Sequence, residues 1–349
     1  MSYPKTYRAW RRSITPYPLN VIQSTETLPD KLGADDVLIK IHAVSLNYRD
    51  HAILQEGGYP IPVEVGGVSG SDCAAEVVAI GSSVTKFAIG NHVAPTVDLL
   101  SLTGNERDEN YVALGGNGPG TLREYAVFEE KVLVKLPTYL SWEEASTLPG
   151  VGTTVWNVLD QLRKPTEDTA ALVQGTGGVS IMALLVCLAA GIKPIITSSS
   201  DAKIAKLKQL SPAVQGINYK TEDVKAQVLR LTSSKGVDFV LNNAGISSLP
   251  DDLAMIRKNG SIALVGFLDG FTAQFPPEVL LTVLLKACKI QGILAGSRVD
   301  LEEINAFLEE KKVDLAPIID KVFSFEETPD AIQYLASGKH VGKIIVKVS

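Results

Sequence analysis

A glycine-rich segment between two apolar stretches is the feature of the sequence that points most directly to chemistry. Residues 170–174 are apolar up to a final glutamine, residues 175–178 read Gly-Thr-Gly-Gly, and residues 179–190 form the next apolar run. Glycines at a strand-to-helix turn let the backbone approach a pyrophosphate, and the first N–H groups of the helix attract phosphates. Ser180 replaces the usual third glycine and is small enough for close helix–strand packing. The pattern predicts a dinucleotide-binding turn, although glycines also suit ordinary tight turns.

The end of the following predicted strand bears on which dinucleotide is bound. Residues 197–201 read Thr-Ser-Ser-Ser-Asp, and Lys203 lies one helical turn after Ser199. NAD-binding proteins usually place an acid here for the ribose 2′-hydroxyl, whereas hydroxyl groups and a cation suit a 2′-phosphate. We therefore predict NADPH as the cofactor. Two alternatives remain open: Asp201 could bind the ribose, or Ser200 and Asp201 could only cap the next helix.

The segments that would position this turn alternate between helix and strand from about residue 140 onward. Ser141 and Glu144 have the spacing of a capping box at the start of a helix. Further strands are predicted at 170–174, 194–197, 238–242, 261–265 and 289–294, and helices at 179–190, 202–210, 249–257 and 277–287. Such alternation is typical of a parallel sheet with helices on both faces.

The first part of the chain, to about residue 130, has the shorter alternating pattern of β-strands. Strands are predicted at 37–44, 76–80 and 92–95, and the chain ends in another strand at 343–348. Residues 98–120 are rich in Gly, Asn and Asp. They are expected to form a long loop, and long loops in compact domains are often functional.

Composition excludes several classes of protein. The chain has 349 residues, enough for about two domains. Its 33 basic and 39 acidic residues give a formal net charge of -6, which argues against nucleic-acid binding. Three cysteines are too few for a four-thiolate zinc site or a disulfide framework. The longest apolar run, residues 181–190, is too short to span a membrane, and no apolar leader follows the basic N-terminus. We expect a cytoplasmic protein.

Together with Asn47-Tyr48-Arg49-Asp50 and the glycines at 81 and 90, these motifs resemble the medium-chain dehydrogenase/reductase superfamily. The sequence is most similar to its zinc-free, quinone-oxidoreductase-like branch, and segments 173–180, 197–201 and 265–268 look like a branch named zinc-type alcohol dehydrogenase-like. The likeness spans nearly the whole chain. It implies an α/β fold: a Rossmann doubly wound parallel sheet over residues 131–298, plus a GroES-like β-rich domain over residues 1–130 that is completed by residues 299–349.

The departures from that resemblance concern metal ligands. Zinc-containing members place a cysteine where this chain has Asn47, and Gly-His-Glu where it has Gly70, Ser71 and Asp72. Neither Asn47 nor Ser71 is a good zinc ligand. The lobe that would hold a structural zinc falls near residues 98–120, which contain no cysteine. We therefore expect both metals to be absent.

The resemblance also assigns site residues. Those implied for the cofactor are Gly177, Gly178 and Val179 at the pyrophosphate, Ser199, Lys203 and Tyr219 at the 2′-phosphate, Thr154, Asn243, Phe267 and Leu268 near the nicotinamide, and Lys343 near the cofactor. The placement of Asn243 and of residues 267–268 just after predicted strands agrees with ligand binding at carboxyl ends. Tyr219 could equally be an ordinary loop tyrosine, and Lys343 a solvated strand residue.

Zinc-free members of the superfamily transfer hydride from NADPH to an electrophilic carbon, often the β-carbon of an enone or quinone. Without zinc, another group must stabilise the developing oxyanion. Asn47, as an amide donor, and Tyr48, as a donor or proton relay, are the catalytic candidates. Arg49 and Asp50 are expected to pair and hold the loop.

Two other functions stay open: metal-free carbonyl reduction or alcohol oxidation, and a non-catalytic role as an NADPH-binding partner protein. The substrate is expected to be a small molecule, in a pocket shaped by Tyr59, residues 98–120 and residues 271–284. The strand predicted at 289–294 should lie at a sheet edge. Since exposed edges invite pairing with another chain, and family members commonly dimerise there, we expect a homodimer.

Overall fold

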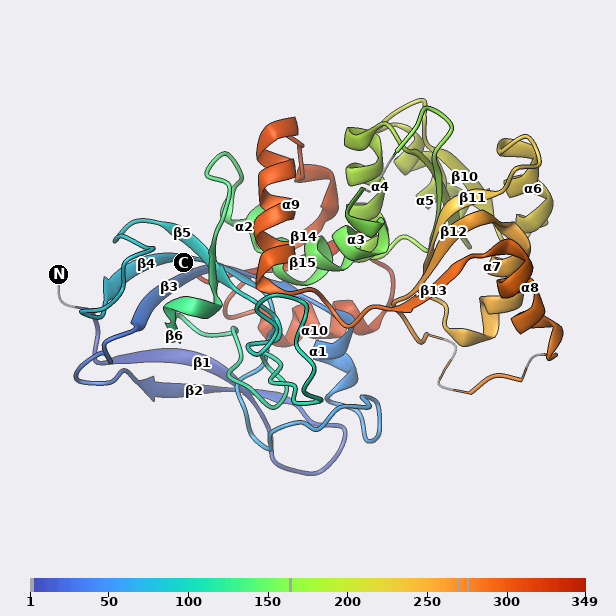
Figure 1. Cartoon of the computed structure of the whole chain (residues 1–349). Coiled ribbons are helices and arrows are strands. Elements are labelled where there is room, and N and C mark those ends of the chain that lie inside the picture. Colours follow the sequence, from blue (N-terminus) through green and yellow to red (C-terminus); the bar gives the residue numbers. More distant parts are fainter. Residues whose placement is uncertain (1–2, 163–164, 269, 271, 275) are drawn as a thin grey trace. The chain divides into compact units, whose positions relative to one another are not determined.

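The computed structural model describes residues 3–162, 165–268, 270, 272–274 and 276–349. The chain forms two compact units, one made of Met1–Thr153 with Ala295–Ser349 and the other of Thr154–Leu294 (Figure 1). The second unit is a parallel α/β sheet and the first is rich in β-strands, so the predicted fold class is confirmed.

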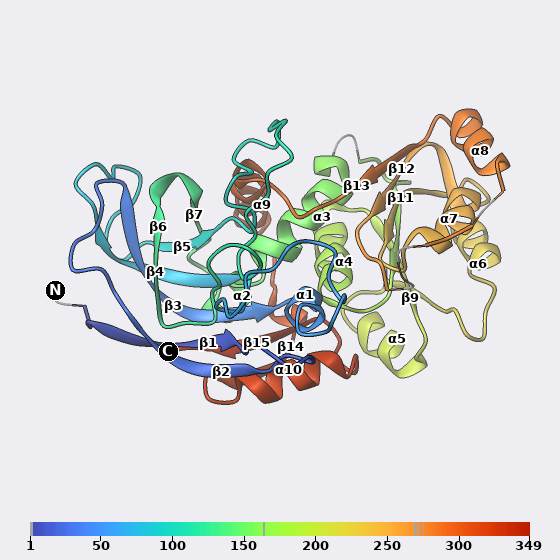
Figure 2. The same cartoon turned by 90° about the horizontal axis from the view of Figure 1, so that it is seen from below.

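The second unit is built around a six-stranded sheet in the order β10-β9-β8-β11-β12-β13, with every neighbouring pair parallel. Figures 1 and 2 show α4 and α5 on one face of this sheet and α6, α7 and α8 on the other. The elements are α3 (Thr153–Val158), β8 (Ala170–Gln174), α4 (Gly178–Ala190), β9 (Lys193–Ser198), α5 (Asp201–Lys208), β10 (Gln215–Asn218), α6 (Val224–Leu231), β11 (Val237–Asn242), α7 (Leu249–Met255), β12 (Ile256–Leu264), α8 (Glu278–Lys286) and β13 (Lys289–Gly292).

This strand order indicates where a ligand is expected to bind. Connections from β8 run to one side of the sheet through β9 and β10, and to the other side through β11, β12 and β13. In open α/β sheets ligands bind outside the carboxyl ends of the strands, where the order reverses. That point lies between β8 and β11.

Sequence patterns missed three elements of this unit, α3, β10 and α6, and misplaced the boundary between α7 and β12. Strand β10 contains Gly216 and Asn218 and gives little apolar signal, so neither it nor α6 was predicted. The helix predicted to end at 257 ends at Met255, and β12 begins at once with Ile256. Ile256 is paired with Val237, so strand pairing overrides the helical pattern there.

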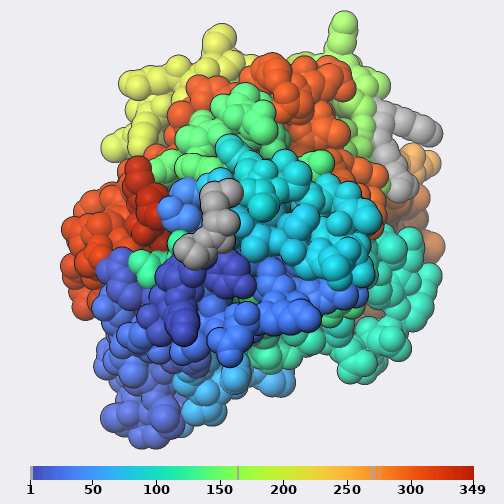
Figure 3. Space-filling model, turned by 90° about the vertical axis from the view of Figure 1, so that its left-hand side faces the viewer, coloured from blue at the N-terminus to red at the C-terminus, as the bar shows by residue number. Residues whose placement is uncertain are grey.

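The first unit has a two-stranded sheet, β1-β2, and a larger sheet in the order β14-β15-β3-β4-β5-β7, with β6 paired to β3. Strand β2 is largely exposed, and the blue N-terminal segment is visible at the surface in Figure 3. The elements are β1 (Thr6–Arg12), β2 (Val21–Thr27), β3 (Asp36–Leu46), α1 (Tyr48–Ala52), β4 (Cys73–Ile80), β5 (His92–Pro95), β6 (Tyr125–Glu129), β7 (Leu133–Lys135), α2 (Trp142–Ala145), α9 (Arg298–Lys311), β14 (Ile319–Ser324), α10 (Thr328–Ala336) and β15 (Lys343–Lys347).

Strand β3 is the centre of this unit because β15 and β4 pair with its two sides. Residues 131–153 also belong here: β7 pairs with β5, and the predicted capping box of Ser141 and Glu144 starts α2. The boundary expected at residue 130 therefore falls inside the unit. Throughout the described ranges, no helix is long and apolar enough to cross a membrane.

Candidate functional site

The glycine turn has the geometry that a pyrophosphate requires. Gly175 has a φ of +80°, which disfavours any other residue, and Gly177 is the N-cap of the 13-residue helix α4. A Cβ placed on Gly177 would meet no described atom within 4 Å, so the backbone is open to close approach. The helix then starts with Gly178 and Val179, whose N–H groups have no acceptor within the helix itself. These residues fit a dinucleotide.

The residues predicted to hold the 2′-phosphate lie at the carboxyl ends of β9 and β10. Asn218 is paired with Ser198, and the backbone N–H of Tyr219 donates to the carbonyl of Ser198 at 3.1 Å. Ser199 follows directly and is exposed, and Lys203 lies in the first turn of α5. The structure thus brings Ser199, Lys203 and Tyr219 to one edge.

The structure bears on the two other roles considered for this segment, helix capping by Ser200 and ribose binding by Asp201. Ser200 does cap α5, because its Oγ accepts a hydrogen bond from the backbone N–H of Lys203. The carboxylate of Asp201 accepts a hydrogen bond from Asn218 Nδ2 at 2.8 Å, so one of its oxygens is engaged within the protein.

Asn243 ties the end of β11 to the glycine turn. Its Nδ2 donates to the carbonyl of Gln174 at 2.9 Å and to Ser180 Oγ at 3.0 Å. Both amide protons are therefore engaged within the protein. Gly266, after β12, lies so close that a Cβ would come within 2.2 Å of the Asn243 carbonyl oxygen.

The other residues predicted to lie near the nicotinamide differ in their exposure to solvent. Phe267 and Leu268 follow β12, and Leu268 is exposed. Thr154 is buried in α3, at the start of this unit.

In the first unit, strand register creates a second candidate site. Ile344 of β15 is paired with Leu46 of β3, which sets Lys343 beside Asn47 across 296 residues of sequence. Lys343 Nζ donates to Asn47 Oδ1 at 2.5 Å and lies 3.6 Å from Asp72 Oδ2. Asn47 Nδ2 in turn donates to Asp72 Oδ2 at 2.9 Å and to Ser71 Oγ at 3.1 Å. We call Asn47, Ser71, Asp72 and Lys343 the buried charge cluster.

Burial dominates the electrostatics of this cluster. Asp72 is 0% and Lys343 3% exposed. Burial raises the pKa of Asp72 to about 6, against the opposing pull of the Lys343 ammonium, and burial lowers the pKa of Lys343. Close packing is completed by Gly150, where a Cβ would approach Asp72 Oδ2 to 2.7 Å. The pair is thus held in a dry environment, where its charges act strongly.

The neighbouring residues of the Asn47 segment have distinct roles. Asp50 Oδ2 accepts a hydrogen bond from the backbone N–H of Asn47 at 2.8 Å and so fixes the start of α1. The expected Arg49–Asp50 ion pair is wrong: although both residues are described, no such pair forms. Arg49 Nη1 donates instead to the backbone carbonyl of Leu114, in the loop of residues 98–120, at 2.6 Å. Tyr48 is 51% exposed.

This cluster does not fit a zinc ion. Within the part of the chain that the structure describes, no three His, Cys, Asp or Glu side chains are grouped to hold a metal. At the positions expected for ligands, only Asp72 is a good donor, and a buried ammonium already stands beside it. A second cation there would be repelled by Lys343.

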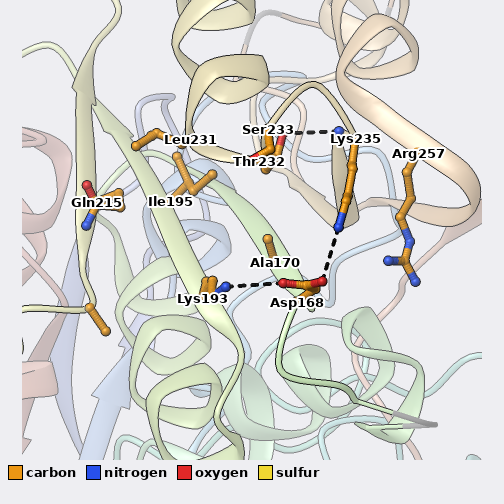
Figure 4. A pocket seen from close by; sticks show the side chains of 12 residues that line it. Asp168, Ala170, Lys193, Ile195, Gln215, Leu231, Thr232, Ser233, Lys235 and Arg257 are labelled. Atoms are coloured by element: carbon orange, nitrogen blue, oxygen red, sulfur yellow. Dashed lines mark hydrogen bonds and ion pairs between the residues drawn. The ribbon is translucent and has the colours of Figure 1, made fainter.

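A cavity of about 430 Å³ lies at the opposite edge of the nucleotide unit, at the amino ends of its strands. Figure 4 shows Asp168 there between Lys193 and Lys235, with which it pairs at 3.6 Å and 3.1 Å. Arg257 pairs with Asp238. Because these cations already pair with carboxylates and the cavity lies at the amino ends of the strands, not at their carboxyl ends, we do not assign the nucleotide to this cavity.

Three residues near the carboxyl edge were not among the predicted site residues: Gln174, Asn242 and Asp252. Gln174 and Asn242 are the last residues of β8 and β11, and their position at strand ends could have marked them as site candidates. Asp252 lies within α7, and its position in the sequence gives no such indication. Residues 271 and 275 of the expected substrate region lie outside the described residues.

Comparison with known proteins gives a consistent family. A family model described as zinc-binding dehydrogenase matches residues 178–310, and one described as alcohol dehydrogenase GroES-like domain matches residues 33–138. A zinc-type alcohol dehydrogenase-like protein of Schizosaccharomyces pombe is 37% identical, over 92% of this chain and 93% of that protein.

Two further relatives extend the comparison. A crystal structure from Sinorhizobium meliloti 1021, provisionally described as an alcohol dehydrogenase, is 34% identical with a TM-score of 0.89, covering 99% of this chain and 100% of that one. The 2-methylene-furan-3-one reductase of Solanum lycopersicum is 27% identical over 99% of this chain and 80% of that protein. Fold, nucleotide-binding edge and these similarities agree: the chain is an oxidoreductase that belongs to the medium-chain dehydrogenase/reductase superfamily.

Proposed function

We propose that the protein is an NADPH-dependent reductase that transfers hydride to the activated C=C bond of an enone or quinone, without a catalytic metal. The observation that carries the metal-free part is the buried ammonium of Lys343, hydrogen-bonded to Asn47. It supplies a fixed positive charge at the position where zinc-containing members are expected to hold their metal. The similarity to a 2-methylene-furan-3-one reductase supports C=C reduction.

Each group of residues has a stated task in this proposal. When bound, the cofactor supplies the hydride. The glycine turn and the start of α4 hold its pyrophosphate, while Ser199, Lys203 and Tyr219 hold the 2′-phosphate. Lys343 stabilises negative charge that develops on the substrate oxygen.

The two catalytic candidates from the sequence take different parts. Asn47 orients Lys343, because its Oδ1 and Nδ2 are both engaged in the buried charge cluster. Tyr48 is exposed, and its phenol is the proposed proton donor.

Carbonyl reduction or alcohol oxidation is the second candidate, favoured by the relatives described as alcohol dehydrogenases. A panel of enones, quinones, aldehydes and ketones, each followed by NADPH consumption, separates the two. Turnover of enones or quinones well above that of simple carbonyls supports our proposal, and the reverse order supports the second candidate. Binding of NADPH without turnover of any substrate would favour a non-catalytic partner role.

The purified protein should contain far less than one zinc per chain and keep its activity in chelator. The reason is that Asn47 and Ser71 are poor ligands and Lys343 repels a second cation. Elemental analysis together with activity before and after chelation measures this. Stoichiometric zinc with loss of activity on chelation would contradict the proposal.

The protein should also form a homodimer through the edge of its nucleotide sheet. The prediction that this strand lies at an edge is confirmed, since β13 ends the sheet order and all four of its residues are exposed. Leu280, Leu281, Leu284 and Leu285 of α8 are exposed in the same unit. Light scattering at micromolar concentration should give a dimer, and Ile290→Lys should shift it toward monomer. A monomeric wild type is the contrary result.

A further inference from the structure

A buried carboxyl group on α7 lies behind the nucleotide edge and is not used in the mechanism above. Asp252 is fully buried, and its two oxygens accept hydrogen bonds from three donors. Gln174 Nε2 donates to Oδ1 at 2.8 Å, while Asn242 Nδ2 and Ser248 Oγ donate to Oδ2 at 2.6 Å and 3.2 Å. The two amide donors, one at each oxygen, favour the ionised carboxyl group, because an amide N–H cannot accept a proton. Ser248 Oγ also lies 3.2 Å from the Gly245 carbonyl, so its hydroxyl can donate to either acceptor.

Gln174 connects Asp252 to the nucleotide edge through its side-chain amide. With Nε2 directed at Asp252, its Oε1 accepts the backbone N–H groups of Asn243 and Ala244, each at 3.2 Å. If the amide turned over, an NH2 group would face those two N–H donors and both bonds would be lost. Gln174 is also the last residue before the glycine turn. The charge on Asp252 therefore selects the amide orientation that holds two parts of the edge together.

Asn242 provides a second connection to the same segment. Its Oδ1 accepts the N–H of Gly245 at 2.8 Å, and its Nδ2 donates to the Gly245 carbonyl at 3.1 Å as well as to Asp252. Gly245 has a φ of +128°, a conformation that needs such support. Both ends of the segment 243–245 thus depend on partners of Asp252.

We propose that Asp252 is a positioning residue for the cofactor: its ionised carboxylate fixes Gln174 and Asn242, which hold the segment 243–245 and the glycine turn in the form that binds the nucleotide. This inference rests on the proposed use of the carboxyl edge by a nicotinamide nucleotide. It adds a residue that touches neither cofactor nor substrate. Loss of its charge should weaken nucleotide binding.

Because Asp252 is buried, it should lose its negative charge near neutral pH. Burial raises its pKa to about 7, and Asp251 on the same helix adds to the rise. Lys286 of α8 donates to the carbonyls of Leu253 and Ala254. The other charged residues on the elements packed against α7 are Lys225 and Arg230 on α6, Asp238 on β11, Arg257 and Lys258 on β12 and Glu278 on α8. Nucleotide affinity should therefore fall as the pH falls from 8.5 to 6.

The test is direct titration of NADPH and NADH from pH 6 to 8.5 with three proteins: wild type, Asp252→Asn and Asp251→Asn. Asp251 is the matched control because it is exposed, adjacent and changes the net charge equally. We expect Asp252→Asn to raise the dissociation constant about tenfold or more at pH 8. It should also lose the pH dependence, whereas Asp251→Asn should keep it with a midpoint at somewhat lower pH, because the charge of Asp251 no longer raises the pKa of Asp252. The 2′-phosphate of NADPH also titrates in this pH range, but it affects all three proteins equally, so the comparison with Asp251→Asn corrects for it.

A second variant covers the case in which Asp252→Asn does not fold. Gln174→Met removes the amide and should weaken binding at pH 8 while losing the same pH dependence, and in the double variant the two effects should not add. Wild-type-like affinity and pH profile in either single variant would overturn the inference. If wild type binds neither nucleotide, the proposed function has failed instead.

Discussion

Replacing Lys343 with methionine should lower kcat about 100-fold or more while changing KM for the substrate little. Methionine keeps the length and apolar stem of lysine but removes the buried ammonium that lies against Asn47 and Asp72. Removal of a single oxyanion-stabilising donor typically costs a factor of about 10²–10³ in kcat. Steady-state kinetics with the best substrate from the panel, at saturating NADPH, measures the effect.

Lys347→Met is the control for that experiment. Lys347 lies on the same strand, but its side chain is exposed and pairs with Glu143 at the surface. Its substitution should leave kcat within about twofold, since exposed ion pairs contribute little. A Lys343→Met protein that retains wild-type kcat would remove Lys343 from the mechanism.

The same substitution should make stability more dependent on pH. Burial already places the pKa of Asp72 at about 6, so its contribution to stability is greatest at low pH and is lost as the pH rises through that value. Without Lys343 the pKa of Asp72 rises further, and a buried unpaired charge costs about 3–5 kcal/mol. Thermal melts should therefore show Lys343→Met destabilised at pH 8 and closer to wild type at pH 5. An equal difference at both pH values would contradict the pairing.

Lys203→Ala should raise the dissociation constant of NADPH about ten- to a hundredfold and leave that of NADH nearly unchanged. A charge-assisted contact with the 2′-phosphate contributes about 1.5–3 kcal/mol. Lys203 stands at the edge where Ser199 and Tyr219 also lie. Ser199→Ala should act in the same direction but more weakly, because it removes a neutral donor. Titration of both cofactors measures each variant.

Lys208→Ala is the matched control, since Lys208 lies in the last turn of the same helix and is exposed. It should bind both cofactors as wild type does. The competing assignment makes Asp201 the ribose ligand and requires a wild type that prefers NADH. The Asn218 bond to the Asp201 carboxylate would then have to be shared with the ribose. Equal affinity of wild type for NADH and NADPH would overturn our assignment.

The nucleotide unit could be predicted from the sequence because its signals are local. The glycine turn, the strand before it and the helix after it are contiguous, and their apolar patterns are strong. Strand β10 was not predicted, because a four-residue strand that contains a glycine has no clear hydrophobic periodicity. Its existence depends on pairing with β9, a contact that the sequence pattern does not contain.

The candidate site of the first unit could be predicted only in part. Asn47 and Lys343 were each named by resemblance, but their contact depends on the register of β15 against β3. The ionic partner of Lys343, Asp72, comes from the segment just before β4, and its full burial cannot be read from its neighbours in sequence. Asp252 could not be identified from the sequence for a related reason: Ser248 is the N-cap of the same helix, but Gln174 and Asn242 lie on strands β8 and β11.

The position of Lys343 has a consequence for the order in which the protein is made. Lys343 follows Asn47 by 296 positions, so β3 is synthesised long before β15 exists to pair with residues 43–46. The nucleotide unit, complete at residue 294, is synthesised well before then. β6 pairs with residues 36–40 of β3, but residues 43–46 stay an open strand edge until β15 is made, and such an edge can pair with other chains. Nascent chains should therefore be vulnerable to aggregation through this edge for as long as β15 has not been made.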